Sequence, residues 1–544
     1  MKSKFIFITG GVLSSLGKGI VAASLGLLLE GKGLKIALMK LDPYLNVDPG
    51  TMNPFQHGEI YVTDDGAETD LDLGHYYRFT NSPLSKISNS TSGQIYDEVL
   101  KKERAGEYLG KTVQVIPHIT DVIKNRIIAC SNQKSDIDVT IIEIGGTVGD
   151  IESQPFLEAI RQFRHEHLGD SINIHLTYVP YIEHADEVKT KPTQHSVQQL
   201  QRSGIFPDMI LCRCKESLSK EIKEKISLFC SVPIERVIDV IDVKNTVYEV
   251  PILLQKAGFD ISISELLDIK KQKSNLQKLE KFVADLISTK KTINIGFIGK
   301  YLQHKDAYKS IFESLTHAGI VNGVLINIIG IDSEKITDED NFSKAVSQCH
   351  GILVPGGFGE RGLEGKVTAA KFCREHNVPY FGICLGMQVM VIEFARNVLN
   401  LHKANTTEID PLTKYKVISL LSEQKNVKNI GGSMRLGAYK CNIDVSSLSY
   451  KAYGKHQISE RHRHRYEFNN EYKKLYEEHG LKVVGTNNDN NEELCEIIEN
   501  INHQWMVGVQ FHPEFKSKPT DPHPLFISFI KAIVSNEKKN CRRD

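Results

Sequence analysis

The chain has 544 residues, of which 40% are apolar and 25% charged, and its 67 Lys and Arg residues balance 67 Asp and Glu residues. A length well beyond the ~250–300 residues at which one core stops growing predicts more than one domain. The zero formal net charge argues against a nucleic-acid partner, because no overall positive field would attract one. Apolar runs stay short of the ~20 residues that span a bilayer, and the N-terminus lacks a signal-peptide layout. Ten cysteines without a C-x-x-C pair favour free thiols, so we expect a cytoplasmic protein with no membrane partner.

The first half of the sequence alternates short β-branched runs with helical stretches. The runs are KFIFITG, LKIALMKLD, VTIIEIGG, INIHLTYVP, DMILCRC and RVIDVIDV. Strands separated by helices predict right-handed crossovers and a mainly parallel sheet. We assign these runs to a first domain over residues 1–267.

A second alternation follows a change of composition. Residues 268–291 are rich in lysine and lack glycine, and their apolar residues recur at helical spacing: Leu276, Leu279, Phe282, Val283, Leu286 and Ile287. This predicts a linker with one amphipathic helix. Strand-like runs then resume with INIGFIGK, GILVPGGFG, VPYFGICLG and WMVGVQFHPE. We therefore predict an α/β protein of two domains, each on a mainly parallel sheet flanked by helices, with the second over residues 292–544.

One cysteine of the second domain lies in the pattern of a nucleophile elbow. In VPYFGICLGMQVM, an apolar run meets Gly382-Ile383-Cys384-Leu385-Gly386 before a helical pattern. This is G-x-nucleophile-x-G with Cys in place of Ser, and the flanking glycines leave room for a sharp turn. The turn would put the thiol at a helix N-terminus, which favours a reactive thiolate. The alternative is a buried structural cysteine beside a glycine turn.

Two further runs favour the reactive cysteine. The glycine pair of VPGGFGERG, residues 354–362, follows a strand and could present backbone N–H groups to an oxyanion. In VGVQFHPEF, His512 and Glu514 end another predicted strand, and period-2 alternation would put both side chains on one side. The carboxylate could then orient the imidazole that activates the thiol, which predicts a catalytic triad of Cys384, His512 and Glu514.

The order of cysteine elbow and C-terminal His-Pro-Glu resembles the class I glutamine amidotransferase family. The resemblance implies hydrolysis of the glutamine side-chain amide through a thioester, with release of ammonia. It implies a glutamine site made of Gly357, Leu385, Gly386, Met387, Gln388, Glu408 and Arg465. In ERHRHRYE, a metal pair of His462 and His464 or a basic patch for RNA are alternatives, but no further ligand cluster or interleaved aromatic surface accompanies them.

The N-terminal run KFIFITGGVLSSLGKGI nearly matches the phosphate-binding pattern G-x-x-x-x-G-K-[ST]. Val12 stands where the first glycine is usual, and Gly19 stands where a Mg²⁺-ligating hydroxyl is usual. Strand, glycine pair, Gly-Lys and helix still occur in the order that wraps phosphates in backbone N–H groups. The alternative is a glycine-rich turn that binds nothing. We interpret the run as a nucleotide loop in which Lys18 reaches the β and γ oxygens.

Without a hydroxyl at Gly19, carboxylates would have to hold the metal. Mg²⁺ prefers one or two carboxylates together with phosphates and waters. Asp70 and Asp72 would share one face if TDLDLGHYYRF were extended, and Glu143 lies near the end of the apolar run VTIIEIGG. We predict that Asp72 and Glu143 bind Mg²⁺, with Asp70 only as a neighbour.

Three further runs are dense in reactive side chains: MKLDPYLNVDPGTMNP, QHGEIYVTDDGAETDLDLGHYYRF and EVKTKPTQHSV. With the loop and the amidotransferase motifs, they resemble the CTP synthase family over essentially the whole chain. The resemblance implies that ATP phosphorylates O4 of UTP and that ammonia from glutamine displaces the phosphate to give CTP. It also implies an internal ammonia tunnel, inhibition by CTP, activation by GTP and a homotetramer, while assembly into filaments stays open.

The resemblance assigns nucleotide contacts residue by residue. The ATP site would comprise Ser15, Leu16, Gly17, Lys18, Gly19, Ile20, Asp72, Ile241, Asp242 and Val243. The UTP or CTP site would comprise Ser14, Asp150, Ile151, Glu152, Lys189, Thr190, Lys191, Pro192, Thr193, Gln194 and Lys225. Lys18 and Lys40 would offset charge on the transferring phosphoryl group. For GTP, only Glu360 and Arg361 stand out as neighbours of the glycine loop.

Three other functions compete with this interpretation. An amidoligase acting on carboxylates of corrin precursors would share the phosphate loop and the cysteine elbow but should lack KTKPTQ and LDPYLNVDPGTM. A nucleotide-switch ATPase would need no glutaminase, and a scaffold with dead sites would not keep every nucleophile, base and lysine. Two departures from the family pattern, Asp186 where glycine is frequent and a short connection between Ser422 and Gly431, touch no proposed catalytic residue.

Overall fold

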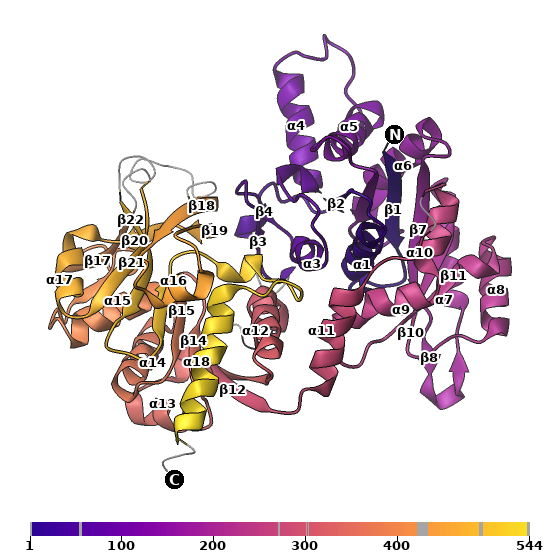
Figure 1. Cartoon of the computed structure of the whole chain (residues 1–544). Coiled ribbons are helices and arrows are strands. Elements are labelled where there is room, and N and C mark those ends of the chain that lie inside the picture. Colours follow the sequence, from indigo (N-terminus) through magenta and orange to yellow (C-terminus); the bar gives the residue numbers. More distant parts are fainter. Residues whose placement is uncertain are drawn as a thin grey trace. The chain divides into compact units, whose positions relative to one another are not determined.

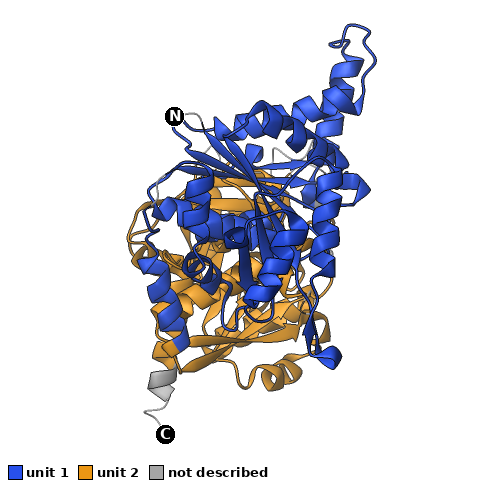
Figure 2. Cartoon of the chain, turned by 90° about the vertical axis from the view of Figure 1, so that its right-hand side faces the viewer, with its two compact units in different colours: residues 1–52, 69–287 blue, residues 53–68, 288–544 orange. Residues whose placement is uncertain are grey.

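The computed structural model describes residues 3–53, 57–269, 272–300, 302, 304–420, 434–488 and 493–540, so the connection between Ser422 and Gly431 lies outside the described residues. Its internal contacts divide the chain into two compact units (Figure 2). The first unit comprises residues 1–52 and 69–287, and the second comprises residues 53–68 and 288–544. The short segment 53–68 therefore packs with the second unit although it interrupts the first. Among the described helices, none combines the length and the apolarity that crossing a bilayer requires.

The first unit is built on a parallel sheet of seven strands in the order β11-β10-β7-β1-β6-β2-β5 (Figure 1). The strands are β1 Lys4–Gly10, β2 Ile36–Asp42, β5 Asn89–Thr91, β6 Val139–Ile144, β7 Ser171–Tyr178, β10 Met209–Cys214 and β11 Val237–Ile241. Each of the six predicted β-branched runs forms one of them, so the predicted parallel sheet is confirmed. Because the strands are parallel, the loops that follow them meet at one edge of the sheet, where ligands bind in such folds.

Helices cover both faces of this sheet. They are α1 Lys18–Gly31, α3 Asp72–Phe79, α4 Ser92–Arg104, α5 Thr120–Ser131, α6 Gln154–Glu166, α7 Lys191–Arg202, α8 Lys220–Cys230, α9 Val250–Lys256, α10 Phe259–Leu266 and α11 Gln277–Ser288. Gly26 of α1 packs on Ile36 and Leu38, whereas Met39 shares a buried cluster with residues of α5 and α6. Since alternate residues of a strand point to opposite faces, α1 lies on one face and α5 and α6 on the other.

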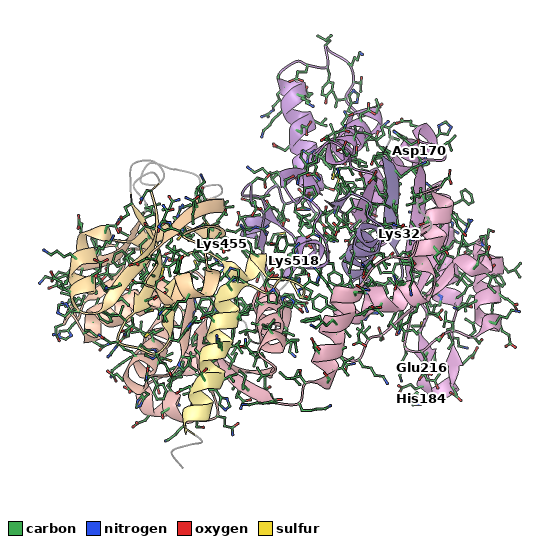
Figure 3. All side chains as sticks on the ribbon, in the orientation of Figure 1. Lys32, Asp170, His184, Glu216, Lys455 and Lys518 are labelled. Atoms are coloured by element: carbon green, nitrogen blue, oxygen red, sulfur yellow. The ribbon has the colours of Figure 1, made fainter. Side chains whose placement is uncertain are left out.

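Residues 268–287 of the region predicted as a linker belong to the first unit, and residues 288–291 belong to the second. Leu279, Phe282 and Val283 of α11 are buried, whereas Ile287, expected on the same apolar face, is 49% exposed. The preceding residues bind the end of α1, where Gln272 Nε2 donates to the carbonyl of Lys32 at 2.8 Å. The Lys32 side chain, labelled in Figure 3, is fully buried and pairs with Asp260 at 3.0 Å. The start of this region is therefore part of a core.

The second unit contains a nine-stranded sheet in the order β13-β12-β14-β15-β23-β22-β21-β18-β19. Its parallel half is β13 Leu325–Asp332, β12 Thr292–Gly299, β14 Gly351–Val354, β15 Tyr380–Ile383 and β23 Met506–Val509. The four predicted runs form β12, β14, β15 and β23. Antiparallel strands extend the sheet: β22 Leu494–Asn500, β21 Leu481–Asn487, β18 Arg435–Ile443 and β19 Gln457–His464.

The remaining elements of the chain complete the two units. The helices of the second unit are α12 Lys309–Val321, α13 Glu339–Val346, α14 Leu363–His376, α15 Leu385–Asn397, α16 Leu448–Tyr453, α17 Lys473–Glu478 and α18 Pro524–Asn540. Three short strands, β16 Ala404–Thr406, β17 Tyr415–Leu420 and β20 Tyr466–Phe468, form a separate sheet. The other small strands are β3 Tyr61–Val62, β4 Glu68–Thr69, β8 Tyr181–Ile182 and β9 Glu187–Val188.

Segment 53–68 is bound to the second unit by polar contacts. Glu59 accepts a hydrogen bond from the backbone N–H of Ser310, at the start of α12, at 2.8 Å. Asp64 accepts from Arg461 Nε of β19 at 2.6 Å, and its carbonyl accepts from Ala438 N at 2.8 Å. These contacts explain why a segment from the first half of the sequence belongs to the second unit.

Candidate active sites

Cys384 lies in a sharp turn between β15 and α15, as the elbow pattern predicts. Its φ is +51°, a strained value for a non-glycine residue. Its backbone N–H donates to the carbonyl of Val509 at 2.7 Å, which anchors the turn to β23. A methyl group at Gly386 would overlap the carbonyl oxygen of Val354, and one at Gly382 would lie 2.5 Å from the carbonyl oxygen of Gly386. The turn therefore needs glycine at both flanking positions.

His512 and Glu514 form the second part of this site. The carboxylate of Glu514 contacts His512 Nδ1 at 2.7 Å, and both side chains are buried. Burial opposes a charge on the imidazole, but Glu514 and the Cys384 thiol outweigh it and raise the pKa of His512 to about 10. His512 Nε2 makes no hydrogen bond to any described residue. The Cys384 thiol is nevertheless close enough to raise the pKa of the ring. The three predicted triad members thus lie together.

The backbone that carries His512 and Glu514 differs from the expectation. β23 ends at Val509, and both residues lie in a 3₁₀ turn, η13 Pro513–Lys516, with His512 as its N-cap. The predicted period-2 alternation is therefore wrong. Pro513 favours this turn, because its ring fixes φ at a helical value and it has no N–H to donate to a strand. The turn still brings the carboxylate onto Nδ1.

The residues predicted to bind glutamine surround the cysteine. A methyl group at Gly357 would lie 3.6 Å from Leu385 Cδ2, so the glycine loop borders the start of α15. Glu408 Oε1 accepts from Gly359 N of the same loop at 2.8 Å. Burial and Glu408 raise the pKa of Tyr466, whereas Arg465 lowers it, which puts these three side chains in one neighbourhood. Gln388 Nε2 donates to the Tyr466 carbonyl at 3.0 Å, and Gly386 and Met387 complete the first turn of α15.

The sequence interpretation missed further residues around the thiol. Gln510 Nε2 donates to Cys384 Sγ at 3.6 Å, and Gln510 Oε1 accepts from Gln388 Nε2 at 3.2 Å. A glutamine two residues before His512 in VGVQFHPEF was the available signal. Arg461 is fully buried, and its carbonyl accepts from His512 N at 2.7 Å. His462 and His464, the alternative metal pair, contact one another at 2.9 Å, and no metal-binding cluster occurs among the described residues.

The phosphate loop connects β1 to α1 in the first unit. Gly17 has φ +98°, which favours glycine, and Ser15 also has a positive φ of +56°. Lys18 is buried, and its Nζ donates to the carbonyl of Gly146, after β6, at 2.7 Å. Burial lowers the pKa of Lys18. Ile20 and Gly19 lie in the first turn of α1, so the loop ends at a helix N-terminus as predicted.

The departure of the loop from the usual pattern at Gly19 has a structural explanation. A methyl group there would overlap the Asp72 carboxylate, so this carboxylate fills the space that a Ser or Thr side chain would need. Lys40 Nζ contacts Asp72 and lies 3.0 Å from Glu143 Oε1. Asp42 and Asp70 are further from this ammonium, at 3.9 and 4.0 Å.

Burial and the neighbouring charges shift the pKa values of these side chains. Burial opposes the Lys40 charge, but Asp72 and Glu143 raise its pKa well above the ordinary value. Burial raises the pKa of Asp42 to about 6. The prediction that Asp70 and Asp72 share one face of an extended run is wrong, because Asp72 begins α3. Its backbone N–H donates to Asp70 Oδ1 at 3.0 Å, so Asp70 supports the start of that helix.

The carboxylates fit a magnesium ion that also takes phosphate oxygens. Asp72 and Glu143 offer oxygen ligands from two elements, and both approach Lys40 Nζ. Among the described residues, no group of three or more His, Cys, Asp or Glu side chains could hold a metal alone. The donor set therefore suits a Mg²⁺ that arrives with a nucleotide.

The residues predicted to bind UTP or CTP follow several strands of the sheet. Ser14 is exposed on the phosphate loop, Lys225 is exposed on α8, and Asp150, Ile151 and Glu152 are exposed around a 3₁₀ turn after β6. Lys189, Lys191 and Pro192 are at least partly accessible, whereas Thr190, Thr193 and Gln194 are buried. Gln194 Nε2 donates to Thr190 Oγ1 at 3.1 Å, so the buried members hold the shape of the run.

A small hairpin of β8 and β9 precedes this run. Asp186 in its turn has φ +47°, a left-handed value that explains why glycine is frequent there. The Asp186 carboxylate accepts a hydrogen bond from Tyr181 OH. His184, labelled in Figure 3, lies in the same turn. The hairpin therefore keeps its turn despite the substitution.

Arg213 is a site residue that the sequence interpretation missed. Its Nη1 donates to the carbonyls of Ser15 and Leu16 at 3.0 and 3.1 Å, and its Nε donates to Asp242 at 2.9 Å. Arg213 thus connects the phosphate loop to the end of β11, where Ile241, Asp242 and Val243 were predicted to contact adenine. An arginine inside the apolar run DMILCRC was the available signal.

Comparison with known proteins assigns both units. The family described as "CTP synthase N-terminus" matches residues 4–269, and the family described as "Glutamine amidotransferase class-I" matches residues 303–532. The CTP synthase of Protochlamydia amoebophila (strain UWE25) is 60% identical over 539 residues, which cover 99% of both chains. The chain belongs to the CTP synthase family. The CTP synthases of Chlamydia pneumoniae and Clostridium acetobutylicum (strain ATCC 824) are 57% and 54% identical, and each match covers 99% of this chain and at least 99% of the relative.

One solved structure matches part of the chain. It is titled as the glutaminase domain of Trypanosoma brucei CTPS with bound acivicin, and it is 39% identical with a TM-score of 0.43. The match covers 45% of this chain and 94% of that structure. As a CTP synthase, the chain is a glutamine-hydrolysing ligase of pyrimidine biosynthesis whose substrates are UTP, ATP and glutamine.

Proposed function

We propose that the two units carry out the two half-reactions of CTP synthesis at the residues described above. The second unit releases ammonia from glutamine at Cys384, His512 and Glu514. The first unit transfers phosphate from ATP to O4 of UTP, and ammonia then replaces that phosphate. The observation that carries the proposal is the position of Cys384 beside the His512–Glu514 pair. In this pair, Glu514 Oε1 lies 2.7 Å from His512 Nδ1.

The glutaminase reaction begins with the thiol. His512 accepts its proton, and the Cys384 sulfur attacks the amide carbon of glutamine. Backbone N–H groups of Gly357 and Leu385 stabilise the resulting oxyanion. His512 returns the proton to the nitrogen, the C–N bond breaks, and ammonia leaves a thioester that water hydrolyses to glutamate. Glu514 stabilises the imidazolium between these transfers. Glu408 and Arg465 hold the amino and carboxylate ends of glutamine.

The synthetase reaction transfers a phosphoryl group in the first unit. UTP O4 attacks the γ-phosphorus of ATP, the bond to the bridging oxygen breaks, and ADP leaves. Lys18 and Lys40 offset the negative charge of the transferring group. Asp72 and Glu143 would hold Mg²⁺, which supplies further positive charge to the phosphates when it is bound. Ammonia then adds to C4, and phosphate departs with the former O4.

Regulation and assembly follow the family expectation. We propose that CTP inhibits by occupying much of the UTP site, that GTP activates the glutaminase, and that ammonia passes to the first unit through an internal tunnel. We also propose a homotetramer and a cytoplasmic location. What supports these points is membership in the family over 99% of the chain.

The first test measures CTP formation by absorbance with UTP, ATP and Mg²⁺, comparing glutamine with ammonium chloride. We expect CTP from both nitrogen sources. If glutamine is hydrolysed while UTP stays unchanged, the glutaminase stands and the proposed acceptor is wrong.

Cys384→Ala separates the two half-reactions. We expect glutamine-dependent CTP formation to disappear, because the nucleophile is lost, while ammonia-dependent formation persists. Cys349→Ala, which removes a partly buried thiol outside the site, is the control. Loss of both activities in a folded Cys384→Ala protein would contradict the model of two separate sites.

A further inference from the structure

Lys366 differs from the other buried lysines of the structure. Lys18, Lys32 and Lys40 each have a polar partner: Gly146 O at 2.7 Å, Asp260 at 3.0 Å and Glu143 at 3.0 Å. Lys366 on α14 is only 1% exposed. Among the described residues, none forms a hydrogen bond or an ion pair with its ammonium group. Burying an unpaired charge destabilises a fold, so such a residue calls for a function.

The Lys366 side chain is directed at the glycine loop of the glutaminase. Its Nζ would lie 3.8 Å from a methyl group at Gly357. On the neighbouring residue, a methyl group at Gly356 would lie 2.9 Å from His512 Cε1 and 3.5 Å from Cys384 Cβ. The glycine pair is therefore bordered by Lys366 as well as by the cysteine and histidine of the triad.

The start of α14 is fixed by close packing. Methyl groups at Gly362 and Gly365 would both overlap Ser333, one at its side chain and one at its carbonyl. These glycines let the first turn of α14 lie directly on Ser333 of the 3₁₀ turn η9 Ser333–Lys335. Lys366 follows within that turn, and its N–H donates to Gly362 O at 3.3 Å. Its side chain thus starts from a rigid position.

The glycine loop is held from its other side. Lys300 Nζ donates to the carbonyls of Phe358 and Gly359 at 3.0 and 3.3 Å. Gly359 N donates to Glu408 at 2.8 Å. Arg463 lies over the Phe358 ring, 5.3 Å from its centroid. With these contacts in place, the distance between Lys366 and the loop is set by the fold.

The charge of Lys366 depends on its surroundings. Its pKa is lowered to about 7, chiefly by burial and also by the neighbouring charge of Lys300, while Cys384 acts in the opposite direction. Lys300 and Cys384 are the titratable groups that act on Lys366 among the described residues. Negative charge at the cysteine would therefore favour the ammonium, and the ammonium would favour that negative charge in return.

We propose that Lys366 is a positioning residue of the glutaminase, whose ammonium acts across the Gly356–Gly357 pair to favour the Cys384 thiolate and the oxyanion formed from glutamine. The inference rests on the proposed triad. Lys366 exchanges no proton with the substrate. Its contribution is positive charge in a buried place, where electrostatic stabilisation is strong.

The test compares Lys366→Met with Lys371→Met. Methionine keeps a long unbranched chain but removes the charge, and Lys371 is a more exposed lysine on the same helix that pairs with Glu339 at 2.8 Å. Three quantities are measured: the glutaminase kcat, the rate of Cys384 alkylation by iodoacetamide across pH, and the unfolding temperature. Alkylation needs no turnover, so it tests the inference even if glutamine is not hydrolysed.

For Lys366→Met we expect the glutaminase kcat to fall roughly tenfold to a hundredfold, less than the roughly hundredfold to thousandfold loss that follows removal of a direct oxyanion donor. The alkylation profile should move to higher pH, and the unfolding temperature should stay equal or rise because an unpaired charge is gone. Lys371→Met should change neither kcat nor the alkylation profile. An unchanged alkylation profile in Lys366→Met would overturn the inference. So would a lowered unfolding temperature with equal loss of all activities, which would assign Lys366 to packing.

Discussion

At the scale of single residues, the phosphate loop shows how a missing group is replaced. Gly19 lacks the hydroxyl that usually binds the metal, and a larger side chain would overlap Asp72. The Asp72 carboxylate and Lys40 occupy this neighbourhood instead. The proposed metal role of Asp72 would thus put a carboxylate from α3 where a hydroxyl from α1 is usual, which requires a small residue at position 19.

Lys18 should be needed for one half-reaction only. For Lys18→Ala we expect loss of CTP formation from glutamine and from ammonia, because the phosphoryl group loses a neighbouring positive charge. Glutamine hydrolysis should remain. Lys4→Ala is the control, because Lys4 lies at the start of β1, at the opposite end of this strand from the phosphate loop, and pairs with Asp170 at 2.7 Å. Normal ammonia-dependent synthesis in Lys18→Ala would remove Lys18 from the mechanism.

The His512–Glu514 pair should give a pH-dependent contribution to stability. Folding raises the pKa of His512 from 6.5 to about 10. The stabilisation is therefore complete below about pH 6.5, declines as the pH rises, and is lost as the pH passes about 10. The destabilisation caused by Glu514→Gln, measured by urea unfolding, should be largest below pH 6.5 and shrink toward pH 10.

Exposed Glu471→Gln provides the reference for this series, because it changes the same group without contacting His512. A Glu514→Gln effect that grows with pH would show that the pair does not stabilise the charged imidazole.

At the scale of elements, the elbow depends on the close approach of α15 to β14. Gly386 lies against the carbonyl of Val354, with no space for a methyl group. At Gly357, by contrast, the nearest atoms to such a group would be 3.6 and 3.8 Å away, an ordinary contact. The two glycines thus serve different purposes, one in packing and one in the loop beside the thiol.

This difference can be measured. Gly386→Ala should lower the free energy of unfolding of the second unit by about 3 kcal/mol, because overpacking displaces the backbone. Gly357→Ala should leave it nearly unchanged. Calorimetry of both variants gives the comparison, and equal destabilisation would mean that the elbow does not limit side-chain size at position 386.

The segment 53–68 also acts at this scale. Its Asp64 carboxylate accepts a hydrogen bond from Arg461 Nε, and the Arg461 carbonyl accepts one from the backbone N–H of His512. Segment and triad are therefore connected through one residue of β19. Residues 42–52, which precede the segment, belong to one of the runs that carry the family resemblance.

At the scale of the whole molecule, each of the two units contains charged side chains that are buried. In the first unit, Lys32 and Asp260 form an ion pair in which both side chains are at most 1% exposed. Ser274 also donates to Asp260, at 2.9 Å, so the pair connects α1, α10 and the residues before α11. Removing one partner would leave the other charge buried alone.

Lys32→Met should therefore destabilise the first unit by about 3–5 kcal/mol. The double variant Lys32→Met/Asp260→Leu should recover most of this loss, because no unpaired charge remains. Urea unfolding followed by circular dichroism, with glutaminase activity as the readout of the second unit, checks both. Equal destabilisation of the single and double variants would show that the charge pair is not the cause.

The sequence by itself determined the strands of the parallel sheets and the elbow around Cys384, and it predicted the members of the proposed triad. These features depend on patterns within about ten neighbouring residues: apolar runs, glycines at turns and short motifs. It also suggested wrong local geometry for Asp70 with Asp72 and for His512 with Glu514, because the extended spacing assumed for them gave way to α3 and to a 3₁₀ turn.

Tertiary structure alone decided the contacts between distant residues. Asp72 fills the space beside Gly19, Arg213 connects the phosphate loop to Asp242, and Lys366 lies next to Gly357. Segment 53–68 joins the second unit for the same reason. Such contacts depend on how helices and strands pack, and many sequences with the same local patterns could pack differently. Local pattern fixes which residue types are present, and packing fixes which of them act together.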